Sequence, residues 1–171
     1  MSTKFFIAVF VGTMAVASAG VCFARLGETE AQLEARYGKP LPPGLLGKSS
    51  DVPPEGKELF WLSEDATLIK VCSLRGRCIR QQYFLLNLQD GGKPKLHLPL
   101  KENMEHVEDW LKQNAQGATW KEGRPAAFAD VDFEMAWVRS DGKAFAYVRN
   151  DSLTIDDLEL LLQGGFSREK R

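Results

Sequence analysis

The sequence predicts an α+β fold in which short helices pack on one face of a mainly antiparallel sheet. Residues 28–37 and 100–117 space their apolar side chains as helices do, with start and stop signals at their ends. Residues 59–88 and 133–149 are rich in β-branched and aromatic residues around glycine-containing turns, which is typical of antiparallel hairpins. The length of 171 residues suits one domain, which we place at 25–171.

The order of these elements is also consistent with a second organisation, two tandem helix–hairpin units at 25–90 and 98–150. The two units are similar in order but hardly in residues. Composition agrees with a globular protein in both cases, because 44% of residues are hydrophobic and 26% are charged. The net charge of −1 shows no basic excess, so we expect no nucleic-acid partner.

Residues 1–24 have the pattern of an export signal peptide, which predicts a periplasmic or secreted protein. Lys4 supplies a positive start, an apolar run follows, and small residues come after that run. Cleavage after Ala19 and cleavage after Ala24 both satisfy the small-x-small rule. The alternative is an uncleaved anchor, since the apolar stretch approaches the ~20 residues that cross a bilayer. The small residues favour cleavage, so we expect no stable membrane span in the mature chain.

The three cysteines are informative if the chain is exported, because disulfides persist outside the cytoplasm. Cys22 does not fit a lipid-attachment signal, since Val21 stands where a small residue is needed. Cleavage after Ala24 would leave two cysteines, Cys72 and Cys78.

A three-residue turn at 74–76, with glycine in the left-handed position, places these two cysteines opposite each other in a hairpin. The same register pairs Ser73 with Arg77, Val71 with Ile79 and Ile69 with Gln81. The sequence therefore predicts a Cys72–Cys78 disulfide that fixes the register of the hairpin.

The first helix is predicted from "GETEAQLEARYGKP", residues 27–40. Thr29 can cap its start with Gln32 as capping-box partner, and Gly38 followed by Pro40 is a stop signal. The carboxylates of this short helix lack a histidine or a second acid at a matched spacing. We therefore interpret them as solvated rather than catalytic; they are Glu28, Glu30 and Glu34.

Residues 39–58 form a predicted proline-rich loop that holds five of the eight prolines. Long loops in compact domains are commonly functional or else linkers. The apolar residues of this loop could seal it to the core or contact a partner. They make it a candidate interaction loop, with Leu41, Pro43, Leu45 and Leu46 as its candidate contact residues.

The second half begins with a helix in which Met104, Val107 and Leu111 follow helical spacing and Gly117 is a stop signal. A hairpin with a three-residue loop at 140–142 follows. Its predicted register pairs Trp137 with Phe145 and Met135 with Tyr147, an aromatic-rich face. Residues 152–163 fit either a capped helix or a final strand.

The predicted core consists of the apolar residues that share the inward faces of these elements. They are Leu33, Tyr37, Ile69, Val71, Ile79, Trp110, Leu111, Trp137 and Tyr147.

The segment "GETEAQLEARYGKP", followed by the amphipathic meander that contains "LIKVCSLRGRCIRQQY", resembles a group of small exported bacterial proteins of unknown function. The short helix ending in Gly-x-Pro before a meander is more distantly similar to the SmpA/OmlA (BamE-like) domain. A tandem version of that arrangement resembles the β-lactamase inhibitory proteins. The latter two resemblances imply a binding function without catalysis.

Motifs for catalysis or cofactor binding are otherwise scarce. Two histidines, His97 and His106, are too few for a zinc site among scattered acids, so we expect no metal and no cofactor. The one reactive pattern is Cys72 and Cys78 beside Lys70 and Arg80, which would suit a thiol-redox enzyme. The preferred interpretation is a non-enzymatic exported module that binds another envelope protein, with thiol-redox chemistry as the alternative.

Overall fold

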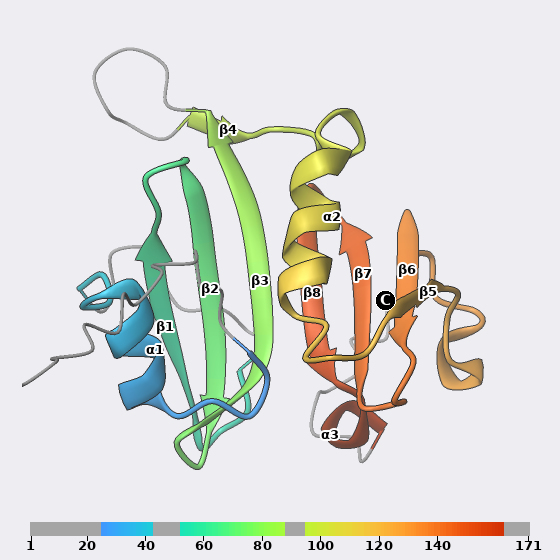
Figure 1. Ribbon diagram of the computed structural model, residues 1–171, viewed down its shortest axis with the longest axis horizontal. Helices are drawn as coiled ribbons and strands as arrows, with labels where there is room; N and C mark the ends of the chain where they lie inside the picture. The colour runs from blue at the N-terminus through green and yellow to red at the C-terminus, as the bar shows by residue number, and fades with distance from the viewer. Residues whose placement is uncertain (1–24, 43–51, 88–94, 163–171) are drawn as a thin grey trace, which may run out of the picture.

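The computed structural model describes residues 25–42, 52–87 and 95–162, which form an α+β fold built on one antiparallel sheet (Figure 1). Seven strands run in the order β1-β2-β3-β8-β7-β6-β5, and β4 pairs with β3 beside this path. Each strand pair is antiparallel. The predicted fold class is therefore confirmed. The predicted signal peptide at 1–24 lies outside the described residues.

The described elements fall into two successive sets, each a helix followed by a meander. The first set contains α1 (Glu30–Tyr37), β1 (Gly56–Leu62), β2 (Thr67–Leu74), β3 (Arg77–Asn87) and β4 (Lys95–His97). The second contains η1 (Leu100–Glu102), α2 (Met104–Gln113), β5 (Trp120–Glu122), η2 (Ala126–Phe128), β6 (Met135–Arg139), β7 (Ala144–Arg149), β8 (Ser152–Asp157) and α3 (Leu158–Leu162).

The two meanders join through β3 and β8. β3 pairs with β8 from Arg80↔Asp156 to Phe84↔Ser152, so the sheet is continuous from one set to the other. β8 lies beyond residue 150, where the predicted second unit ends, so the second meander extends to Asp157. Hydrogen bonds across β3 and β8 therefore bind together elements that are separated by about half of the chain.

Helix α1 has the caps that its sequence predicts. The Thr29 hydroxyl accepts from Gln32 N at 3.3 Å, and the Gln32 side-chain oxygen accepts from Thr29 N at 2.9 Å. The helix ends at Gly38, whose φ of 77° is readily adopted only by glycine. The eight-residue helix buries Leu33 completely, and this contact holds it against the sheet.

Helices α1 and α2 lie on the same face of the sheet, α1 over the first meander and α2 near the β3–β8 junction (Figure 1). Most predicted core residues are buried between these helices and the strands: Leu33, Ile69, Val71, Trp110 and Leu111. Tyr37 and Trp137 are partly buried against the same cluster, and Ile79 is also buried. Tyr147 differs, because it packs on the opposite face of the sheet with Phe133 and Phe145.

The predicted register of the first hairpin is wrong. Arg75 and Gly76 form a two-residue turn with φ values of 52° and 73°, so a non-glycine residue also takes the left-handed conformation. Leu74 then pairs with Arg77 and Ser73 with Cys78. A bulge at Ile79 shifts the ladder by one residue, so the next pairs are Cys72↔Arg80 and Val71↔Gln81.

The predicted register of the second hairpin is also wrong, by one residue. Its connection contains four residues, Ser140–Lys143, because Asp141 Oδ1 accepts from Lys143 N at 3.0 Å and from Arg139 Nε at 2.9 Å. Trp137 pairs with Ala146 instead of Phe145, and Met135 pairs with Val148 instead of Tyr147. The shift places Trp137 on the helix-covered face and the two predicted aromatic partners on the other.

Residues 152–162 combine the two alternatives left open by the sequence. Ser152–Asp157 is a strand, and Leu158–Leu162 is a short helix. Asp157 caps this helix, because its side chain accepts from Leu160 N at 3.1 Å.

Candidate functional site

The two cysteines of the described residues are free thiols, and both are buried. The predicted disulfide is therefore absent from the structure. The bulge at Ile79 is the physical reason, because it moves Cys72 opposite Arg80 and leaves Cys78 opposite Ser73. Cys78 belongs to the helix-covered core, whereas Cys72 shares the opposite face with Arg80. Two thiols on opposite faces of a sheet cannot meet the geometry of a disulfide without movement of the backbone.

Burial makes both thiols poor nucleophiles. It raises the pKa of Cys72 to about 11, although the neighbouring Arg80 partly opposes the shift. It raises the pKa of Cys78 to about 12, against a hydrogen bond that Gln81 Nε2 donates to Cys78 Sγ at 3.3 Å. The thiolate is the reactive species, so both groups are almost entirely in the inert thiol form at neutral pH.

Cys78 begins a chain of hydrogen bonds that crosses the helix-covered core. Gln81 donates to its sulfur, and Tyr83 OH donates to Gln81 Oε1 at 2.6 Å. Asn114 Nδ2 donates to Tyr83 OH at 3.0 Å and also to Trp110 O at 2.9 Å. Burial raises the pKa of the Tyr83 hydroxyl, which stays a neutral donor. This chain connects β3 to the end of α2 and thereby links the two sets of elements.

The opposite face of the sheet carries two buried ion pairs. Arg80 Nε and Nη2 donate to the two carboxylate oxygens of Asp156 at 2.5 and 3.1 Å, in a bidentate arrangement across β3 and β8. Lys70 Nζ lies 2.8 Å from Glu58 Oε1 across β2 and β1. Burial raises the pKa of Asp156, and Arg80 opposes that shift. These charges neutralise one another inside the fold, which indicates a structural role.

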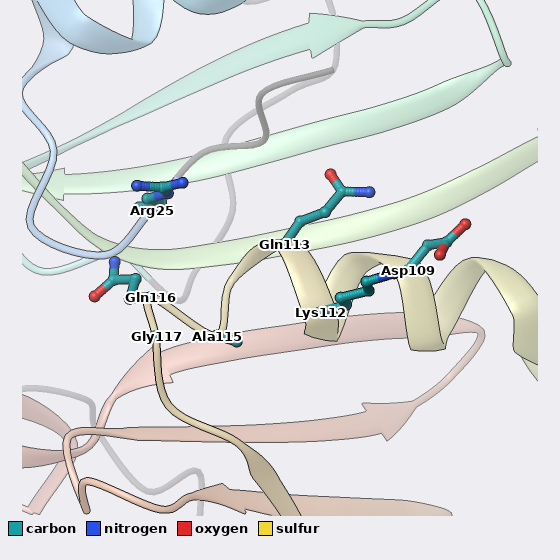
Figure 2. Close-up of a pocket in the computed structure, with 7 residues that line it drawn as sticks. All are labelled: Arg25, Asp109, Lys112, Gln113, Ala115, Gln116 and Gly117. Atoms are coloured by element: carbon teal, nitrogen blue, oxygen red, sulfur yellow. The ribbon is translucent and has the colours of Figure 1, made fainter. Parts of the chain in front are cut away.

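A solvent-facing recess lined mostly by polar side chains lies between the start of the first set of elements and the end of α2 (Figure 2). We call it the α2 recess, and its volume is about 490 Å³. Its lining residues are Arg25, Asp109, Lys112, Gln113, Ala115, Gln116 and Gly117. A hydrogen bond from Gln116 Nε2 to Leu26 O at 3.3 Å connects its two walls.

Charged and amide side chains lie at both ends of the α2 recess, with Lys112 beside Asp109 (Figure 2). Arg25 and Gln116 lie together at one end, whereas Gln113 and Asp109 project from the same side of α2 toward the other (Figure 2). Gln113 Oε1 is buried and has no hydrogen-bond partner in the structure. The arrangement offers a guanidinium for a carboxylate and the Asp109 carboxylate for a cationic or N–H group.

The remaining predicted residues have other roles or lie outside the description. Leu41 is half-buried, and its N–H donates to Phe60 O at 2.7 Å beside the edge strand β1. Pro43, Leu45 and Leu46 of the candidate interaction loop lie outside the described residues. The carboxylates of the first helix have polar contacts: Glu28 pairs with Arg36, and Ser73 Oγ donates to Glu30 Oε1 at 2.9 Å.

The sequence predicts that the two histidines, His97 and His106, do not form a metal site. The His106 ring lies 5.8 Å from that of Trp110, on α2. No cluster of three metal-ligating side chains occurs within 25–42, 52–87 and 95–162. In those same ranges, no helix has the length and apolar character that crossing a membrane requires.

Sequence reasoning missed the α2 recess because its walls are separated by more than 80 positions in the chain. In the sequence, Gly117 indicates only the end of a helix, and Arg25 is only the residue after a candidate cleavage site. The amphipathic pattern of α2 does place Asp109 and Gln113 one turn apart. What that pattern lacks is the position of Arg25 relative to α2 (Figure 2).

Comparison with known proteins gave no match to a family model, to a curated protein or to a solved structure.

Proposed function

We propose that this chain is a non-catalytic exported protein that binds another protein of the cell envelope, with the α2 recess as the contact site. One observation carries the proposal. The described thiols are buried with raised pKa values, whereas the solvent-facing recess contains charges and amides but no thiol, hydroxyl or histidine side chain. Such a lining can orient a ligand through hydrogen bonds and ion pairs.

The lining also suggests the chemistry of the partner segment. Arg25 can hold a carboxylate through two parallel hydrogen bonds, and Lys112 adds a second positive charge. The Asp109 carboxylate can accept from an amine or amide of the partner. A polar protein segment that carries both an acidic and a basic group fits this pattern better than an apolar helix.

A photo-crosslinking amino acid at position 112 tests the site in the native cell. We expect it to capture a defined protein, identified by mass spectrometry, because position 112 lines the recess. The matched control is the same amino acid at position 121, an exposed lysine on β5. Capture of the same protein from both positions, or loss of capture in neither Asp109→Lys nor Arg25→Glu, would contradict the assignment.

Thiol-redox chemistry is the alternative, and the raised pKa values of both cysteines weigh against it. We expect the purified protein to show no insulin-reducing turnover above the level of its Cys72→Ser variant. Robust turnover that disappears in Cys72→Ser would overturn the binding proposal in favour of an enzyme.

A further inference from the structure

Glu28 is a mostly buried carboxylate at which two donors meet. One of its oxygens forms a salt bridge with Arg36, and the other, Oε2, accepts from the main-chain nitrogen of Arg25 at 3.0 Å. Its side chain is only 12% exposed. Two hydrogen bonds fix this segment to the start of β3, from Gly27 N to Cys78 O at 2.7 Å and from Cys78 N to Glu28 O at 2.8 Å.

We propose that signal cleavage occurs between Ala24 and Arg25, and that Glu28 binds the α-ammonium group which this cleavage creates. The inference rests on the export that is part of the proposed function. Hydrolysis by a signal peptidase consumes one water, breaks the Ala24–Arg25 amide bond, leaves a carboxylate on Ala24 and makes the nitrogen of Arg25 an ammonium. That nitrogen already points at Glu28.

Charge distinguishes the two possible mature chains, because only cleavage after Ala24 places an ammonium group at Glu28. In a chain that begins at Gly20, the nitrogen of Arg25 is an amide, a neutral donor to Glu28. In a chain that begins at Arg25 the same hydrogen bond is charge-assisted, and such bonds are roughly twice as strong as neutral ones. Cleavage after Ala24 also removes the apolar run Gly-Val-Cys-Phe-Ala at 20–24, including the thiol of Cys22.

The first experiment identifies the amino terminus. The full chain is produced in a bacterial host that exports it, and the processed protein is examined by intact mass and amino-terminal sequencing. We expect the mature chain to begin at Arg25. A chain that begins at Gly20, or that keeps residues 1–24, would overturn the proposal. The result is independent of crosslinking at position 112, so failure of this inference and failure of the proposed function are distinguishable.

The second experiment asks whether Glu28 recognises the new terminus. Two lengths of the processed protein are compared, one that begins at Arg25 and one that keeps Ala24, each with and without Glu28→Gln. With Glu28 in place, we expect the chain that begins at Arg25 to have a Tm about 2–4 °C higher. In Glu28→Gln the two lengths should melt together. An equal difference with and without the carboxylate would show that Glu28 does not bind the ammonium.

Discussion

The two faces of the sheet bury polar groups in different ways. The helix-covered face contains a chain of neutral hydrogen bonds from Cys78 through Tyr83 to Asn114, and the main-chain oxygen of Asn114 also accepts from the buried Arg139 at 3.2 Å. The opposite face places full charges in contact, with Arg80 and Asp156 joined across the junction of the two meanders. Removing one neutral hydrogen bond costs a modest amount of folding free energy. Removing one member of a buried ion pair costs more, because it leaves the other charge buried without its partner. The opposite face should therefore be the more sensitive to single substitutions.

The largest expected effect follows from Asp156→Ala. The variant leaves the buried Arg80 guanidinium without that carboxylate, and we expect the free energy of unfolding to fall by about 3–5 kcal/mol. Urea denaturation followed by tryptophan fluorescence measures the loss. The control is Arg80→Met combined with Asp156→Leu, which removes both charges and should recover most of the stability. A loss below about 1 kcal/mol in Asp156→Ala would show that the pair does not hold this face.

The second-largest effect is expected from alkaline pH, which should lower the free energy of unfolding through a thiol on the helix-covered face. Cys78 ionises near its ordinary pKa of 9 when the chain is unfolded and at about 12 when it is folded, so the folded state holds the proton more tightly. The stability that this thiol contributes is complete below pH 9 and falls as pH rises from 9 toward 12, by up to about 1.4 kcal/mol per pH unit. Unfolding measured from pH 7.5 to 10 should show this slope, to which Cys72 also contributes because burial raises its pKa to about 11.

The comparison protein for that experiment is Cys78→Ala. Its stability should change less between pH 9 and 10, although its absolute stability is lower because the side chain is shortened. Burial also raises the pKa of Tyr83, whose own contribution begins to be lost only above the ordinary tyrosine value of 10. Identical slopes for the two proteins between pH 9 and 10 would exclude Cys78 as their source.

A smaller effect is expected when the neutral chain is interrupted. Tyr83→Phe removes the hydroxyl that connects Gln81 to Asn114, and we expect a loss of about 1–2 kcal/mol because two buried groups lose a partner. Chemical denaturation measures it, and Tyr83→Phe with Asn114→Ala shows whether the two side chains act as a unit. A loss as large as that of Asp156→Ala would remove the distinction between the two faces.

The smallest effect should come from an ion pair at the surface. Lys101 Nζ lies 3.2 Å from Glu134 Oε2, with the lysine side chain 64% exposed. Solvent screens such pairs, so Lys101→Ala should change the free energy of unfolding by less than about 0.5 kcal/mol. Thermal melts at low and high salt give the measurement. A large, salt-dependent loss of stability in Lys101→Ala would mean that this exposed pair contributes as much as the buried pair Arg80–Asp156.

Local signals in the sequence determined the helices and the approximate positions of the hairpins. Thr29, Gln32 and Gly38 specify the ends of α1 through contacts within a few residues, so the capping box could be predicted. The apolar stripe of α2 likewise identified Val107 and Leu111 as core residues. The α+β class follows from such local patterns, because the period of apolar residues distinguishes helices from strands.

Tertiary structure decided what depends on register and on distant contacts. A bulge at Ile79 and one additional loop residue at Lys143 reversed the expected faces of Cys78 and Phe145, because side chains in a strand alternate and a shift of one residue exchanges the faces. The pairing of β3 with β8 then brought Arg80 to Asp156, and the packing of α2 brought Gln116 into hydrogen-bond contact with Leu26. These contacts join residues more than 70 positions apart, and no local period in the chain specifies such a pairing.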